Sequence, residues 1–150
     1  MNTPKLPLEG SCLCGQVQIH VTEPPLLTFA CHCRDCQKLC AGAYSLTAMF
    51  PTDSFSVAGE LVIGGMRCEQ RKHYFCPDCM NFIFSQIEGA EMRVNLRVSL
   101  LDDLTWFQPF VEVMTEEGLS WSRVPAAHSF ARRPETAEEL TQLMADYARR

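Results

Sequence analysis

The sequence predicts a mainly β domain that ends in one helix, and three observations support this. Short segments with alternating apolar and polar residues recur through most of the chain, separated by proline, glycine and aspartate. Helical periodicity appears near the C-terminus. Closely spaced cysteines stand beside several strand-like segments, as in small folds stapled by metal. We expect residues 1–150 to form a single domain, since this length is ordinary for one.

The strand pattern is clearest at residues 16–22, where Val17, Ile19 and Val21 alternate with polar residues. We predict strands, in chain order, at residues 16–22, 26–31, 43–50, 55–57, 61–63, 71–75, 82–87 and 91–99. The last two should pair through a turn at residues 88–90. Weaker strand patterns cover residues 106–115 and 119–123, a single helical turn is expected at 34–39, and residues 1–8 predict an irregular arm.

The C-terminal segment predicts a helix at about residues 137–149. Thr136 with Glu139 three residues later is the pattern of a capping box. The apolar positions then follow at i, i+3, i+4 and i+7, and are Leu140, Leu143, Met144 and Tyr147. Such a stripe is typical of a helix that docks on the rest of the domain.

Composition excludes several classes of function. The formal net charge is −5 and the pI about 5.3, which disfavours a nucleic-acid partner. No apolar run is long enough to predict a membrane partner, and residues 1–10 do not resemble a signal peptide. The chain has nine cysteines, an odd number that argues against a disulfide scaffold. We therefore expect metal-bound thiolates in the reducing cytoplasm.

Two cysteine pairs predict a structural zinc site. In Cys76-Pro77-Asp78-Cys79 the proline favours a type I turn that brings the two thiols together. Cys12 and Cys14 supply the two further ligands of a closed tetrahedral site. The alternative is a redox-active C-x-x-C motif, which the missing βαβ pattern disfavours.

Cys31, Cys33 and Cys36 form a second group with one ligand fewer than a tetrahedron needs. Either Cys40 or Cys68 closes it as a structural site, or a substrate takes the fourth position. Zinc with three thiolates has a formal charge of −1, which suits the binding of a further thiol better than hydrolysis. Arg34 and Lys38 would offset that charge or are surface residues, and alternation should turn His32 away from the cluster.

Three motifs, in this order, resemble the glutathione-dependent formaldehyde-activating enzyme family, which includes the centromere protein V-like proteins. They are Gly10-Ser11-Cys12-Leu13-Cys14-Gly15, Cys31-His32-Cys33-Arg34-Asp35-Cys36 and Phe75-Cys76-Pro77-Asp78-Cys79. Leu101-Asp102-Asp103 also fits, and the resemblance covers roughly residues 8–110. The sequence departs from the family pattern at Leu39-Cys40-Ala41-Gly42, which brings in an extra thiol, and at Met80-Asn81.

The resemblance implies a β-tent of short antiparallel strands with two zinc ions per chain. One would be structural, at Cys12, Cys14, Cys76 and Cys79, and one catalytic, at Cys31, Cys33 and Cys36. It further implies a cytoplasmic carbon–sulfur lyase whose partner is a small thiol such as glutathione, in an adduct of the S-hydroxymethylglutathione type. The alternatives are a non-catalytic, zinc-stabilised binding module and a thiol redox or metal-buffering protein.

Overall fold

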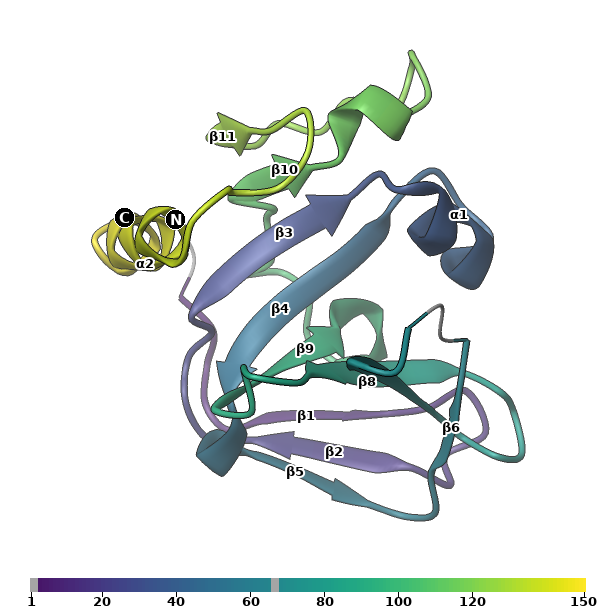
Figure 1. Cartoon of the computed structure of the whole chain (residues 1–150). Helices are drawn as coiled ribbons and strands as arrows, with labels where there is room; N and C mark the ends of the chain where they lie inside the picture. The colour runs from purple at the N-terminus through teal and green to yellow at the C-terminus, as the bar shows by residue number, and fades with distance from the viewer. Residues whose placement is uncertain (1–2, 66–67) are drawn as a thin grey trace.

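The chain folds into two β-sheets and two helices, shown in Figure 1 as a computed structural model that describes residues 3–65 and 68–150. The smaller sheet is antiparallel, with the order β1-β2-β5. Its strands are β1 (Leu8–Ser11), β2 (Gln18–Val21) and β5 (Phe55–Ala58). This sheet lies beneath the larger one and supplies the second layer of the fold.

The larger sheet has eight strands in the order β11-β10-β3-β4-β9-β8-β7-β6. In that order they span His128–Ser129, Val111–Val113, Leu27–Cys31, Ser45–Pro51, Arg93–Arg97, Phe82–Ile87, Arg71–Phe75 and Val62–Gly64. The expected antiparallel pairing holds for β1 to β9, whereas β10 joins parallel to β3 and β11. Strand β3 lies far from β10 in the sequence, and a long connection separates β10 from β11. Local sequence patterns do not predict such pairings.

Helices α1 (Arg34–Cys40) and α2 (Ala137–Ala148) lie at opposite ends of β3 (Figure 1). Three short 3-10 helices, η1 (Thr52–Ser54), η2 (Val98–Leu100) and η3 (Thr115–Glu117), connect strands. In the described part of the chain, no helix combines the length and apolar character needed to cross a membrane.

The main hydrophobic core lies between the two sheets. Ile19 of β2, Phe50 of β4 and Ile83 of β8 are at most 1% exposed within it. Gly10 allows β1 to approach η2, because a Cβ at this position would lie 2.3 Å from the carbonyl oxygen of Leu100. This close approach fixes the end of β1, from which the first cysteine pair continues.

A second apolar cluster joins α2 to the other face of the large sheet. Leu143 and Tyr147 of α2 are buried there with Leu27 of β3 and Val111 of β10. The predicted docking stripe of this helix is therefore confirmed. Its cap is also present, since the hydroxyl of Thr136 accepts a hydrogen bond from the backbone N–H of Glu139 at 3.1 Å.

Several local predictions were wrong. Strand β10 covers only Val111–Val113 of the segment predicted at 106–115, and no strand was predicted for β11. Residues 119–123 form no strand, because a turn closes there with the Ser122 N–H donating to the Leu119 carbonyl at 3.0 Å. Strand β1 starts inside the segment predicted as an irregular arm, in a stretch whose glycine and serine hide the strand pattern. Helix α1 has seven residues rather than one turn.

Candidate functional site

The structure brings Cys12, Cys14, Cys76 and Cys79 together as the four-cysteine cluster, whose sulfurs all lie within 4.8 Å of one another. The first two follow β1 and the last two follow β7, so the cluster connects the two sheets. Residues widely separated in sequence thus form one group with the donor set of a structural zinc site.

The geometry of the four-cysteine cluster fits zinc. The sulfur of Cys14 lies 3.6 Å from that of Cys12 and 3.7 Å from that of Cys76. In a tetrahedral site with Zn–S bonds of about 2.3 Å, neighbouring sulfurs lie about 3.8 Å apart. Burial alone would raise the pKa of Cys12, but hydrogen bonds from the Val17 amide and the neighbouring thiols lower it to about 6. Burial and contacts with Cys12, Cys79 and Cys76 raise the pKa of Cys14 to about 12, so only one of these two thiols readily loses its proton.

One hydrogen bond also joins the two halves of this cluster, and a second closes the turn of its later half. The N–H of Leu13 donates to the side-chain oxygen of Asn81 at 3.0 Å, and the N–H of Met80 donates to the Cys76 carbonyl at 3.0 Å. Met80 has a φ of 58°, in the region that favours glycine. The departure from the family pattern at Met80-Asn81 thus keeps the tight turn and adds a hydrogen bond across the cluster.

The three-cysteine cluster consists of Cys31, Cys33 and Cys36, whose sulfurs also lie within 4.8 Å of one another. Cys31 ends β3, Cys33 is the N-cap of α1, and Cys36 lies in its first turns. The N–H of Cys36 donates to the sulfur of Cys33 at 3.3 Å. Hydrogen bonds from the thiols of Cys31 and Cys36 hold the pKa of Cys33 well below its ordinary value.

No fourth cysteine, histidine or carboxylate joins this cluster within residues 3–65 and 68–150. Cys40, at the end of α1, is exposed, and so is Cys68. His32 is 2% exposed and points elsewhere, with Nε2 lying 3.0 Å from a carboxylate oxygen of Glu112. The position of His32 agrees with the expectation from strand alternation, and zinc ligation by the three cysteines stays a prediction.

Side-chain hydrogen bonds from β10 and from α1 itself hold the segment that carries the three-cysteine cluster. Glu112 of β10 accepts hydrogen bonds from Ser129 at 2.8 Å and contacts His32. The side-chain N–H groups of the buried Gln37 donate to the carbonyls of His32, at 2.7 Å, and Glu117, at 3.0 Å. These contacts fix α1 against the large sheet, so the cysteines have a defined position.

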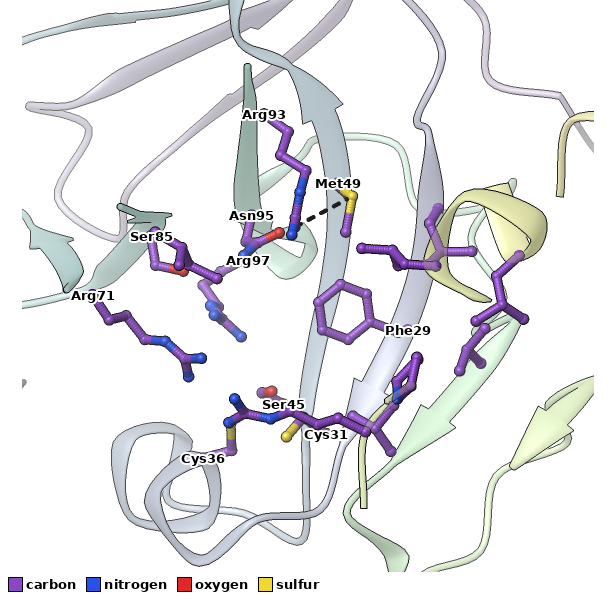
Figure 2. A pocket seen from close by; sticks show the side chains of 18 of the residues that line it. Phe29, Cys31, Cys36, Ser45, Met49, Arg71, Ser85, Arg93, Asn95 and Arg97 are labelled. Carbon is purple, nitrogen blue, oxygen red and sulfur yellow. Dashed lines mark hydrogen bonds between the residues drawn. The ribbon is translucent and has the colours of Figure 1, made fainter. Parts of the chain in front are cut away.

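The three-cysteine cluster borders a pocket of about 400 Å³ on one face of the large sheet (Figure 2). Cys31 and Cys36 contribute to its wall, and Ser45 of β4 lies beside them. Because side chains alternate along strands, every second residue of β3 and β9 faces this pocket: Leu27, Phe29 and Cys31 on β3, and Arg93, Asn95 and Arg97 on β9. A volume of this size is typical of sites for small organic ligands.

Among the described residues, four arginines line the pocket, Arg133 before α2 and three on strands. The strand arginines, Arg71, Arg93 and Arg97, are functional candidates that the sequence analysis missed. In Figure 2, Arg71 and Arg97 extend their guanidinium groups toward the space above Cys36 and Ser45. None of the ion pairs in the described part of the chain includes any of the three. The pocket therefore has a cationic wall available to an anionic ligand.

Arg97 is held most firmly. Its guanidinium carbon lies 4.4 Å from the ring centre of Phe82, and Nη1 donates to the hydroxyl of Thr47 at 2.7 Å. Its buried Nε finds no hydrogen-bond partner among the described residues. Burial lowers the pKa of Arg97, and electrostatic attraction to Cys36, Cys40 and Cys31 opposes that shift.

The cations expected from the sequence have other roles. Arg34 and Lys38 are exposed on α1, and the guanidinium of Arg34 bonds the side chain of Gln37. The sequence does contain a pattern that could have predicted the arginines of the pocket. Arg93, Asn95 and Arg97 stand at every second position. That spacing places all three on one face of a strand, opposite the apolar Val94 and Leu96.

Comparison with known proteins supports one family. The model of the family described as glutathione-dependent formaldehyde-activating enzyme matches residues 7–117, which contain all seven cysteines of the two clusters. A search of curated proteins found no match. A crystal structure of a Rhodobacter sphaeroides protein is similar in fold, with a TM-score of 0.54 and 21% identity over 65% of this chain and 90% of that chain. With the family match covering most of its length, the chain belongs to the glutathione-dependent formaldehyde-activating enzyme family.

Proposed function

We propose that this protein is a zinc-dependent carbon–sulfur lyase that acts on an adduct of glutathione or a related small thiol, of the S-hydroxymethylglutathione type. The observation that carries the proposal is the three-cysteine cluster on the wall of a pocket whose strand arginines, Arg71, Arg93 and Arg97, lie outside any described ion pair. Membership of the family supports the same chemistry. We place the protein in the cytoplasm, where such thiols stay reduced.

The proposal assigns different roles to the two clusters. Cys12, Cys14, Cys76 and Cys79 would hold a structural zinc, and Cys31, Cys33 and Cys36 a catalytic one, two per chain in all. When bound at the three cysteines, zinc supplies the Lewis acidity that lowers the pKa of a coordinating thiol. The close approach of the three sulfurs, all within 4.8 Å of one another, and the buried positions of Cys31 and Cys33 favour metal binding at this cluster.

The arginines would bind the rest of the thiol substrate. Glutathione has two carboxylates, and charge-assisted hydrogen bonds from Arg71 and Arg97 are suited to such groups. Their positive charge also offsets the negative charge of the thiolates, since Arg97 and the sulfur of Cys36 attract each other. The substrate sulfur is thereby directed to the cysteines while its carboxylates are held on the strands opposite.

The reaction balances without an oxidant or reductant. In the cleavage direction, the carbon–sulfur bond of the hydroxyalkyl adduct breaks and its electron pair moves to sulfur. The hydroxyl group loses its proton as the aldehyde C=O forms, and the sulfur gains a proton to give the free thiol. The reverse sequence adds the thiol to the aldehyde. Arg97 stabilises the sulfur anion that both directions share.

Metal analysis combined with glutathione binding tests this proposal. We expect two metal ions per chain and, in protein loaded with cobalt, a change in the thiolate absorption bands when glutathione is added. Cys36→Ser should remove one metal ion and this response, whereas Cys68→Ser, at an exposed cysteine outside both clusters, should change neither.

Two other results would favour the alternatives. Two metal ions without any response to glutathione, and without catalysis of its reaction with formaldehyde, would favour a binding module. One metal ion or none, with Cys31, Cys33 and Cys36 rapidly oxidised, would favour a redox protein.

A further inference from the structure

We propose that His73 is the catalytic base that takes the hydroxyl proton of the hemithioacetal during cleavage and returns a proton to the same oxygen during addition. The inference rests on the proposed function, because such a base is needed only if the adduct binds at the three cysteines. His73 is buried on β7 and lines the pocket, but it has no part in the steps described above.

Contacts through Gly65 place His73 next to the helix that carries the cysteines. Nδ1 of His73 lies 2.8 Å from the carbonyl oxygen of Gly65. Gly65 in turn lies against α1, since a Cβ on this glycine would be 2.8 Å from the side chain of Leu39. Leu39 stands three residues after Cys36 and is therefore its neighbour on the helix surface. Cys36, Leu39 and His73 all line the pocket, so the histidine lies at its cysteine end.

The hydrogen bond to Gly65 determines which nitrogen of His73 acts as a base. A carbonyl oxygen only accepts hydrogen bonds, so Nδ1 must carry the proton in this bond. In the neutral ring the lone pair is then on Nε2. Among the residues that the structure describes, Nε2 has no hydrogen-bond partner, so its lone pair is available to a hydroxyl group of the substrate.

The surroundings of His73 favour the neutral, basic form of its ring. Burial lowers the pKa of His73, and the hydrogen bond to the Gly65 carbonyl opposes that shift. Two cations, Arg97 of β9 and Arg71 of β7, lower the pKa further, whereas Asp35 of α1 raises it. The net shift is downward, so the ring is uncharged at neutral pH and able to accept a proton.

Phe82 places this base beside the cation that stabilises the sulfur anion. The centre of the Phe82 ring lies 4.9 Å from that of His73 and 4.4 Å from the guanidinium carbon of Arg97. In a hemithioacetal the hydroxyl oxygen and the sulfur are bonded to the same carbon, so the groups that act on them have to be neighbours. His73 and Arg97, on either side of Phe82, meet this requirement.

Glu135 is the other candidate base, and its position disfavours it. Outside the three-cysteine cluster, only His73 and Glu135 among the described pocket residues can take up a proton at neutral pH, because arginines keep their charge. Glu135 stands two residues before α2, at the end of β3 opposite to α1 (Figure 1). The carboxylate is thus far along the pocket from Cys36, whereas His73 is near it.

The proton transfers balance in both directions. In cleavage, the hydroxyl proton moves to Nε2, the O–H electron pair forms the second bond of the aldehyde C=O, and the carbon–sulfur pair moves to sulfur. The imidazolium then releases its proton to water, and the sulfur gains one to give the free thiol. In addition, the thiolate attacks the aldehyde carbon and the imidazolium protonates the alkoxide oxygen.

The test is His73→Gln, whose side-chain amide can donate to Gly65 but cannot take up a proton. We expect kcat for the cleavage of S-hydroxymethylglutathione, corrected for the spontaneous reaction, to fall by about a hundredfold or more. KM, metal content and melting temperature should stay close to the wild-type values. His20→Gln, on the smaller sheet and outside the described lining of the pocket, is the matched control and should keep the wild-type kcat.

Two measurements on the wild-type protein add independent tests. As the pH falls through the pKa of His73, kcat for cleavage should decrease while the metal content is unchanged, and His73→Gln should lack this decrease. Nitrogen-15 NMR should show His73 in the Nδ1–H tautomer at neutral pH. The Nε2–H tautomer would overturn the proposal, since no lone pair would then be available on Nε2.

A His73→Gln variant with unchanged kcat, or with only a raised KM, would overturn the inference and leave the proposed function intact. Loss of a metal ion from this variant would also overturn it, because His73 would then be a metal ligand. If the wild-type protein neither responds to glutathione nor cleaves the adduct, the proposed function fails, and the inference fails with it.

Discussion

The two cysteine clusters use the same donor atom and differ in how the chain assembles them. The four-cysteine cluster takes its ligands from residues 12–14 and 76–79 and connects two sheets. The three-cysteine cluster takes all its ligands from residues 31–36, at the junction of β3 and α1. The first offers four protein sulfurs, enough for a closed tetrahedral site, whereas the second offers three and borders a pocket.

Because of this difference, we expect the four-cysteine cluster to contribute mainly to folding stability and the three-cysteine cluster mainly to activity. A metal held by distant segments links its binding free energy to folding, because the unfolded chain does not keep the ligands together. A metal held by one short segment constrains little of the chain and is accessible to substrate. We therefore expect removal of ligands from the two clusters to have opposite effects on folding and activity.

Cys76→Ser should have the largest effect on stability. Structural zinc contributes about 10–16 kcal/mol of apparent binding free energy, comparable to the whole stability of a domain. We expect the variant to lose cooperative thermal unfolding, as followed by circular dichroism. Cys36→Ser is the matched variant in the other cluster, and it should keep a cooperative transition while losing one metal ion. A Cys76→Ser protein with two metal ions and wild-type thermal stability would refute the division of roles.

Arg71→Gln should affect the three-cysteine side alone. A charge-assisted hydrogen bond contributes about 1.5–3 kcal/mol, so we expect the KM for glutathione to rise by about tenfold to a hundredfold. Thermal stability and metal content should change little, because Arg71 is only partly buried and outside the described ion pairs.

Lys72→Gln is the control for this experiment, since Lys72 is the exposed neighbour on the same strand. The same rise in KM in both variants would show that overall charge, rather than the pocket, attracts the substrate.

Local patterns in the sequence predicted most of the strands and the cysteine motifs. Residues 71–75 and 82–87 form strands with the predicted bounds, and the C-terminal helix starts at Ala137 as expected. Such segments depend on neighbours in the chain, so alternation and capping patterns reveal them. The parallel pairing of β10 with β3 depends on contacts across about 80 residues, for which a single sequence carries no signal.

The same reasoning explains why the pocket was missed. The strands that carry Arg71 and Arg97 were predicted, but bringing both arginines into one pocket with Cys36 requires the strand order β4-β9-β8-β7. A polar residue on a strand is interpreted as exposed to solvent when the sequence does not show what covers that face of the sheet. The cysteine motifs were visible because metal ligands are constrained in local spacing, whereas residues that bind a substrate are constrained only in space.

Cys40→Ser should have the smallest effect, and it bears directly on the comparison between a closed and an open cluster. Cys40 ends α1, where Ala41 adopts the left-handed conformation and turns the chain away, and its side chain is exposed. It lies outside the group of sulfurs formed by Cys31, Cys33 and Cys36. We expect the variant to keep two metal ions, with kcat/KM for the glutathione reaction within about twofold of the wild type, because an exposed cysteine makes few contacts. Loss of one metal ion would mean that Cys40 moves in to complete the tetrahedron, so that both clusters are closed by protein and no position remains for a substrate thiol.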